Sequence, residues 1–405
     1  MRVPNVAQAA INIAGVRLRR AERHWRTVAG ALARLGRKAR RQGELLSRAP
    51  ALVRARVQRG RAAIERSRKR AARFNDHALT PYRTERRVVR VLARAASSGG
   101  PIIAGPWTSE VGYEVLYWIP FLHWVVDRYA VQPDRVIALS RGGTQSWYGG
   151  IATRYVEIFD LVEPGEVAAQ AAARRDRGDQ KQMAPSDFDT ELVRLASERL
   201  GIHDAVVWHP GVMYELFRAF WHGDRSLEFL FRHTNFHRVR TTGHPPSDLA
   251  LPPEYAAVKF YTGPALPDTE LNREVLHDLV RRLAARMPVV MLDTAWAVDE
   301  HRDYAFEGID GVTTLRPSLD PRTNLGLQTR VVAGAKRFVG TCGGLAWLAP
   351  LLGVDTLAVY EDDRYLTAHL YAARYAYRRT QAARFSTLNI KALRGINAAL
   401  GAEAS

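Results

Sequence analysis

The chain has 405 residues, of which 47% are hydrophobic, and a formal net charge of +18. This length and composition exclude a disordered chain and allow two or three domains with real hydrophobic cores. The charge is concentrated at one end, because residues 1–100 contain 26 Lys and Arg against 5 Asp and Glu, whereas the remainder contains 33 against 36. We therefore expect a basic appendage followed by a nearly neutral globular body.

Residues 1–75 are expected to form basic amphipathic helices. An apolar stripe recurs there at steps of three and four residues, through Ile11, Ala14, Leu18, Ala21, Trp25, Val28, Leu32 and Leu35. Arginines surround this stripe, which favours a helix lying on an anionic membrane surface. The heptad-like spacing leaves a coiled-coil protein partner open. No nucleic acid partner is expected, because the body carries no nucleic-acid-binding motif.

Three features indicate the compartment. Cys342 is the only cysteine, so no internal disulfide can form. No run of 18 or more apolar residues is present, and the N-terminus lacks the apolar core of a signal peptide. We expect a cytoplasmic protein that is peripheral on the inner face of the plasma membrane.

Residues 76–245 are expected to form an α/β domain with a largely parallel sheet. The segments Ile102–Ala104 and Arg135–Leu139 read as buried strands, and the apolar helix between them contains Pro120, which should kink or break it. Binding side chains should gather at the carboxyl ends of the strands. The acceptor or cleft candidates at these ends are Arg141, Gly142, Trp147, Tyr148 and His209.

Two carboxylates follow the first of these strands. Glu110 and Glu114 are four residues apart, which would place them on one face of a helix. Either could act as a general base toward a hydroxyl group. The alternative is a pair of acids that stabilise the start of a helix. By contrast, Asp187 and Asp189 precede a helical segment and read as helix-capping residues, so no metal site is expected.

Residues 246–405 repeat the alternation of strands and helices, with strands expected at Tyr255–Tyr261, Pro288–Leu292 and Val312–Leu315. Lys259 lies in the first of them, where it is either an edge residue or a cation directed at a phosphate. The segment ends with "FVGTCGGLAWLAPLLGVDTLAVY", Phe338 to Tyr360. This pattern predicts a βαβ unit whose first turn is rich in glycine. Such a turn suits a phosphate, but it also suits tight helix–strand packing.

The two successive halves, with a glycine-rich turn late in the second, resemble the GT-B glycosyltransferases. The likeness is nearest to bacterial heptosyltransferases and fucosyltransferase-like enzymes of surface polysaccharide synthesis, and it covers roughly residues 100–390. In "GYEVLYWIP", Glu114 lies six residues before Pro120, the offset of the family's catalytic acid. The extra residue Tyr113 departs from that pattern, which leaves Glu110 as a rival base.

The resemblance implies two Rossmann-like domains and a nucleotide-sugar donor held by the second half. The positions that it assigns to the donor are Lys259, Asn324, Gln328, Thr329, Gly340, Thr341, Gly343 and Gly344. It implies metal-independent transfer of a hexosyl, heptosyl or deoxyhexosyl group to a hydroxyl of a cell-surface glycan or lipid-linked acceptor, with no cofactor. A polysaccharide pyruvyltransferase, a nucleotide-sugar 2-epimerase and a non-enzymatic membrane-associated glycan-binding scaffold remain alternatives.

Overall fold

The computed structural model describes residues 26–35, 64–65, 67–69, 79–178, 181–241, 249–294, 301–364 and 366–393. The chain divides into two compact units, Met1–Asp76 and His77–Ser405. In the first unit the described residues are helical, as expected. The stripe positions from Ile11 to Trp25 lie outside the described residues, and Leu35 is 58% exposed. Both predicted α/β halves fall within the second unit.

The first half is built on a four-stranded parallel sheet of order β3-β2-β1-β4. Its strands are β1 (Ile102–Ala104), β2 (Val136–Ser140), β3 (Arg154–Glu157) and β4 (Val206–Trp208). Its helices are α3 (Thr80–Ser97), α4 (Val111–Tyr113), α5 (Ile119–Tyr129), α6 (Pro164–Asp176), α7 (Asp187–Leu200), α8 (Pro210–Trp221) and α9 (Leu227–Arg232). The strands are parallel because the connections between them cross over the sheet and return the chain to the end at which the previous strand began.

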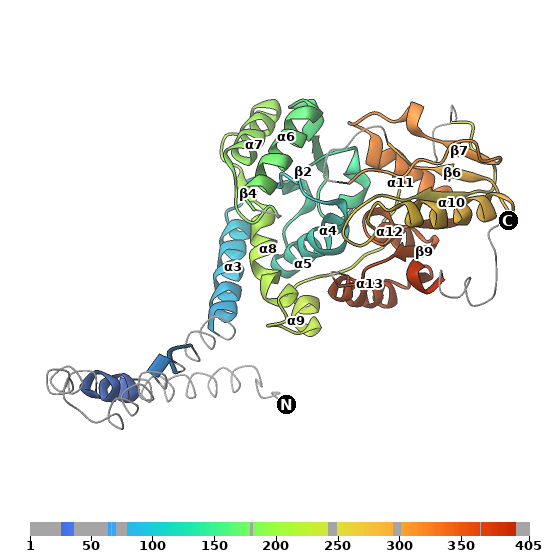
Figure 1. Cartoon of the computed structure of the whole chain (residues 1–405). Coiled ribbons are helices and arrows are strands. Elements are labelled where there is room, and N and C mark those ends of the chain that lie inside the picture. Colours follow the sequence, from blue (N-terminus) through green and yellow to red (C-terminus); the bar gives the residue numbers. More distant parts are fainter. Residues whose placement is uncertain are drawn as a thin grey trace, which may run out of the picture. The chain divides into compact units, whose positions relative to one another are not determined.

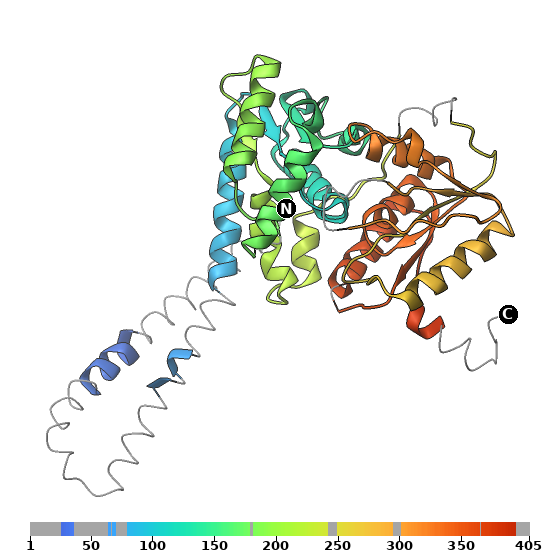
Figure 2. The same cartoon turned by 45° about the horizontal axis from the view of Figure 1, so that its top comes forward.

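The second half contains a six-stranded parallel sheet of order β10-β9-β8-β5-β6-β7. Its strands are β5 (Ala256–Lys259), β6 (Val289–Met291), β7 (Val312–Thr314), β8 (Arg337–Thr341), β9 (Asp355–Tyr360) and β10 (Phe385–Asn389). Its helices are α10 (Glu270–Ala284), α11 (Asn324–Gly334), α12 (Gly344–Leu348) and α13 (Thr367–Thr380). Figures 1 and 2 show the two halves side by side. The predicted class, α/β with two Rossmann-like sheets, is confirmed.

The strand order determines where a ligand can bind. In each sheet the chain runs outward in one direction from its first strand and then returns to the other side of that strand. The reversal lies between β1 and β4 in the first half and between β5 and β8 in the second. Doubly wound sheets form a crevice at this point, beyond the carboxyl ends of the two strands. The loops after these four strands are therefore the expected site-forming segments.

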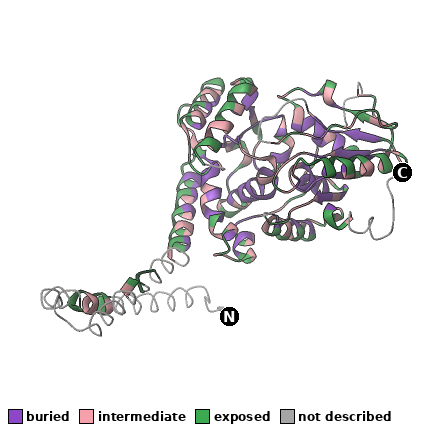
Figure 3. Ribbon diagram, viewed as in Figure 1, coloured by how far each residue is buried: buried purple, intermediate pink, exposed green. Residues whose placement is uncertain are grey.

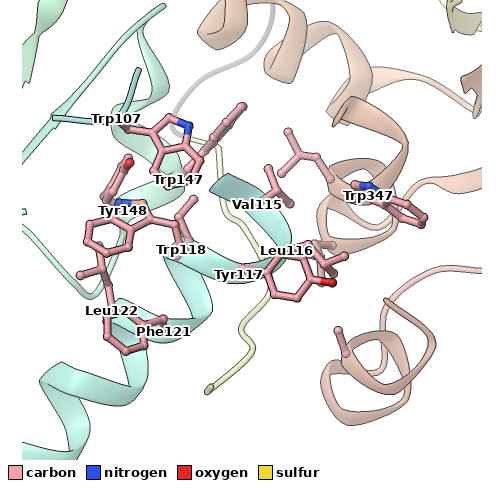
Figure 4. Packing of buried hydrophobic residues seen from close by; sticks show 14 of the residues in the cluster. Trp107, Val115, Leu116, Tyr117, Trp118, Phe121, Leu122, Trp147, Tyr148 and Trp347 are labelled. Atoms are coloured by element: carbon pink, nitrogen blue, oxygen red, sulfur yellow. The ribbon is translucent and has the colours of Figure 1, made fainter. Parts of the chain in front are cut away.

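The central strands of both sheets are buried, whereas the edge strands β7 and β10 and one face of the outer helices α10 and α13 are partly exposed (Figure 3). In the first half an aromatic cluster includes Trp107, Trp118 and Phe121, of which Phe121 belongs to α5 (Figure 4). Trp107 stacks on Trp118 with ring centroids 5.9 Å apart and on Tyr214 at 6.1 Å. Complete burial of side chains of this size contributes about 1.5–3 kcal/mol each. This cluster fixes the loop after β1 against the body of the domain.

The helix expected around Pro120 is interrupted just before the proline. Residues Glu114–Trp118 form a π-helical segment between α4 and α5, and Pro120 lies in the first turn of α5. A proline is tolerated there because the first turn needs no N–H donor. A π-helical turn holds one residue more than an α-helical turn. Tyr113, the extra residue noted against the heptosyltransferase pattern, ends α4 and directly precedes this turn.

Candidate functional site

A cavity of about 460 Å³ lies between the two halves, at the carboxyl ends of both sheets. The first half lines it with the segment after β1, residues 110–113, and with the end of β2. The second half lines it with the segments after β5 and β6, the start of α11 and the glycine turn after β8. The segments after β1, β5 and β8, three of the four strands at the chain reversals, therefore face one space. The predicted residues on its lining are Glu110, Arg141, Lys259, Asn324, Gln328, Thr341, Gly343 and Gly344.

The glycine turn connects β8 to α12. A Cβ atom at Gly343 would lie 2.1 Å from the hydroxyl oxygen of Tyr261, and Gly343 has a φ of 155°. Close packing against Tyr261 is therefore enough to require glycine at this position. At the start of α12, the N–H groups of Gly344 and Leu345 have no acceptor within the helix. These N–H groups are suited to an anion, and both residues line the cavity.

Lys259 is the last residue of β5 and lines the cavity, but its ammonium group already forms an ion pair. Its Nζ donates to Asp303 Oδ2 at 2.8 Å and to the carbonyl oxygen of Leu292 at 2.8 Å. Asp303 also accepts hydrogen bonds from the backbone and the hydroxyl of Thr294. A phosphate at this position would share Lys259 with Asp303 rather than meet an isolated cation.

Glu110 is the carboxylate that faces the cavity. It precedes the first turn of α4 and forms an ion pair with Lys181, and the two side chains are 28% and 22% exposed. Lys181 also lies over the ring of Tyr113, with its Nζ 4.1 Å from the ring centroid. Glu110 thus remains accessible to a ligand while it is paired with a neighbouring cation.

Glu114 lies in the wall of the first half and does not line the cavity. It is fully buried, and its Oε1 accepts hydrogen bonds from Ser140 Oγ at 2.7 Å and Tyr148 Oη at 2.6 Å. Its Oε2 is buried without a partner. Burial raises the pKa of Glu114 to about 7. This corrects the expectation that Glu114 faces the reacting groups, because the π-helical segment turns its side chain toward β2.

The loop after β2 contacts the second half more than it contacts the cavity. Gly142 and Gly143 both have positive φ, and their N–H groups donate to the carboxylate of Glu157 at 2.9 and 2.8 Å. A Cβ at Gly142 would lie 3.0 Å from a side-chain atom of Leu325 in α11. The expectation that Gly142 lines the acceptor cleft is therefore wrong, since its N–H group is bonded to Glu157 and its Cα packs against Leu325.

Five further predicted site residues are structural. Trp147 is buried and donates to Thr329 Oγ1 at 2.9 Å, so both residues join the two halves. Tyr148 is buried on Glu114. His209 precedes α8, and its Nδ1 accepts from the N–H of Gly211 at 3.0 Å. Gly340 packs against β5, where a Cβ would lie 2.4 Å from the carbonyl oxygen of Lys259. The structure places none of the five on the cavity lining.

The cavity also contains residues that the sequence prediction missed. The aromatic members are Tyr113, Tyr261, His301, Trp347 and His369. The hydroxyls of Tyr113 and Tyr117 contact the ring nitrogens of His369 at 3.4 and 2.5 Å. Burial lowers the pKa of His369 to about 4, so this ring is neutral at pH 7. Tyr261 and His301 follow β5 and β6 along the chain, a position from which the carboxyl-end rule could have found them.

The described residues contain no cluster of three or more His, Cys, Asp or Glu side chains arranged to hold a metal ion. Asp189 is a helix-capping residue as predicted, because Ser186 and Asp189 form reciprocal hydrogen bonds at the start of α7, whereas Asp187 lies in the first turn of that helix and is not part of this capping pair. Within the described ranges, no helix has the length and apolar composition needed to cross a bilayer.

No protein-family model and no curated protein matches the chain. Among solved structures, the glycosyl transferase family 9 protein from Veillonella parvula aligns over 77% of this chain and 91% of its own, with 11% identity and a TM-score of 0.41. The E. coli heptosyltransferase WaaC with ADP aligns over 73% and 98%, with 15% identity and a TM-score of 0.36. E. coli ADP-heptose LPS heptosyltransferase II aligns over 65% and 85%, with 15% identity and a TM-score of 0.34. At these identities and TM-scores the similarity establishes neither family membership nor activity.

Proposed function

We propose that the chain is a glycosyltransferase that moves a sugar from a nucleotide-sugar donor to an acceptor hydroxyl. The observation that supports this best is the composition of the cavity between the two sheets. One half contributes an accessible carboxylate, Glu110, and the other contributes a glycine turn at the start of a helix. The motif of that turn, "FVGTCGGLAWLAPLLGVDTLAVY", is also the stretch that resembles the donor-binding segment of GT-B enzymes.

In the proposed reaction Glu110 is the general base. Its carboxylate takes the proton of the acceptor hydroxyl as that oxygen forms a bond to the anomeric carbon of the donor. The bond between the anomeric carbon and the diphosphate breaks, and the negative charge that develops there is stabilised by the first N–H groups of α12 and by Lys259. We propose that this transfer needs no divalent metal. Hexosyl, heptosyl or deoxyhexosyl donors all fit the proposal.

The first experiment tests the donor. Thermal unfolding of the full chain is measured with ADP, UDP, GDP, their sugar conjugates and phosphoenolpyruvate. Stabilisation by one nucleoside diphosphate and its sugar conjugate is expected, because ligands that bind only the folded state raise its stability. Stabilisation by phosphoenolpyruvate alone would favour pyruvyl transfer, and stabilisation by none of these compounds would favour a glycan-binding scaffold.

The second experiment tests the base. In Glu110→Gln we expect turnover of the bound donor to fall by about 10²-fold or more, the usual scale for a general base, with little change in donor affinity. Glu228→Gln, on the exposed surface of α9, is the matched control. Unchanged turnover in Glu110→Gln would remove this residue from the mechanism. Release of an epimerised donor, rather than transfer, would point to a nucleotide-sugar 2-epimerase.

We further propose that residues 1–75 hold the enzyme on an anionic membrane, where a cell-surface glycan or lipid-linked acceptor is made. The sequence supports this proposal, because nearly all of the excess basic charge lies in the N-terminal part of the chain, where it accompanies an apolar helical stripe. Each basic residue near an anionic surface contributes about 1 kcal/mol. The full chain should sediment with anionic vesicles, less so in high salt, and a chain that starts at Asn75 should not. Equal sedimentation of both chains would assign the membrane contact to the body.

A further inference from the structure

Five lysine, arginine or acidic side chains are among the described residues that line the cavity, and four of them form two ion pairs. Lys181 pairs with Glu110, and Lys259 pairs with Asp303. The fifth is Arg141, at the end of β2, for which no carboxylate of the described chain lies within ion-pair distance. One positive charge of the cavity wall is therefore not balanced by a direct partner.

Arg141 is also poorly satisfied in its hydrogen bonds. Only 6% of the residue is exposed, and one terminal nitrogen donates to the carbonyl oxygen of Ser109 at 3.0 Å. Its Nε is buried and has no hydrogen-bond partner. A guanidinium group has five N–H donors, and leaving a buried charge or donor without a partner is costly. Such a group in a native protein needs an explanation, and an anion or water that supplies the missing acceptor is one of them.

The carboxylates near Arg141 already accept hydrogen bonds from other groups. The carboxylate of Glu157 binds the N–H groups of Gly142 and Gly143. Glu114 accepts from Ser140 and Tyr148 through one oxygen, and its burial opposes ionisation. A second guanidinium, Arg174, donates to Thr108 Oγ1 at 2.9 Å, and burial lowers its pKa while the nearby Asp189 opposes that shift. The carboxylates at this end of the first sheet therefore have hydrogen-bond partners of their own, and none of them forms an ion pair with Arg141.

We propose that Arg141 binds a phosphate or carboxylate carried by the acceptor, close to the hydroxyl group that attacks the donor. The Arg141 guanidinium is held by Ser109, the residue directly before Glu110. An anion on Arg141 therefore lies beside the loop that presents the base of the proposed reaction, whereas the donor diphosphate is assigned to the glycine turn of the other half. The planar guanidinium is suited to two parallel hydrogen bonds with either anion. The acceptor class is thus an acidic or phosphorylated glycan, an assignment that rests on the proposed function.

Thermal unfolding of the full chain tests this assignment, with inorganic phosphate, glucuronate and neutral glucose as probes. Each probe is added alone and in the presence of the nucleoside diphosphate that stabilises the chain most. Arg141→Gln, Arg141→Lys and a control, Arg154→Gln on the exposed start of β3, are compared with the unchanged chain. Melting in the absence of ligand shows whether each variant folds.

We expect phosphate or glucuronate, but not glucose, to stabilise the nucleotide-saturated chain. Whichever of the two stabilises it more identifies the anion. In Arg141→Gln the apparent dissociation constant for that probe should rise at least about tenfold while nucleotide binding persists, since a hydrogen bond to a charged group is worth this much or more. Arg141→Lys should retain part of the effect, and Arg154→Gln all of it.

Three results would overturn the assignment. Unchanged probe binding in Arg141→Gln would show that this side chain holds no anion. Loss of nucleotide binding in the same variant would assign Arg141 to the donor diphosphate instead. Failure of every anionic probe to stabilise the unchanged chain, with nucleotide binding intact, would mean a neutral acceptor. Failure of all nucleotides together with Arg141-dependent phosphate binding would refute the donor proposal but support Arg141 as an anion-binding residue.

Discussion

Replacement of Glu114 by glutamine should change how the stability of the body depends on pH. Glu114 is fully buried and its two hydrogen-bond donors, Ser140 and Tyr148, both contact Oε1. Burial raises its pKa in the folded chain from 4.5 to about 7. Because the folded state binds this proton more tightly than the unfolded state, the stabilisation is largest at low pH. It is lost as the pH rises through the folded pKa of about 7.

The size of the effect follows from the shift. A pKa difference of one unit corresponds to about 1.4 kcal/mol, so this shift corresponds to roughly 3 kcal/mol over the whole titration. Between pH 5 and pH 8 the folded chain should lose about 2–3 kcal/mol of unfolding free energy from Glu114 alone. Glutamine does not ionise, and it preserves an oxygen for Ser140 and Tyr148. The variant should therefore lack this component.

Urea unfolding followed by tryptophan fluorescence at pH 5 and pH 8 measures the effect, with Glu110→Gln as the control that keeps Glu114 in place. His123 and His369 contribute in the opposite sense, because burial lowers their pKa values to about 3 and about 4. Their contribution is common to all three proteins and cancels in the comparison. Parallel pH dependences for the unchanged chain and Glu114→Gln would refute the reasoning and would mean that Glu114 is solvated or paired in solution.

Three further outcomes are expected. Gly326→Ala should lower the melting temperature, because the new Cβ would lie 2.4 Å from a backbone carbonyl oxygen of the first half and overpacking costs about 1–3 kcal/mol; Gly165→Ala, which meets nothing within 4 Å, is its control. Trp147→Phe should cost about 1 kcal/mol in urea unfolding, since it removes the hydrogen bond to Thr329, and no loss would show that this bond between the halves is dispensable. Cys342 is 3% exposed and burial raises its pKa to about 12, so a thiol reagent at pH 8 should label the native chain at least about 10²-fold more slowly than the urea-unfolded chain; equal rates would contradict its burial.

Local patterns in the sequence were sufficient to predict the architecture. Buried strands that alternate with amphipathic helices require crossover connections, and these connections impose parallel sheets. The expected strand Ile102–Ala104 has those bounds in the structure, and Arg135–Leu139 is observed one residue later as β2. The segment from Phe338 to Tyr360 forms the predicted βαβ unit, with Gly353 in a left-handed conformation at the end of the helical stretch.

The sequence alone predicted that loops at the carboxyl ends of the strands form the site, whereas only the tertiary structure decided which of these loops and side chains face the cavity. The alternation of strands and helices is a local pattern, so the segments after β1, β2, β5 and β8 could be named in advance, but the segment after β6 also lines the cavity and His209, after β4, does not. The direction of a side chain depends on contacts with residues far along the chain. Glu114 and Glu110 are four residues apart, yet a π-helical turn and the hydroxyls of Ser140 and Tyr148 bury the first, while Lys181 holds the second at the cavity.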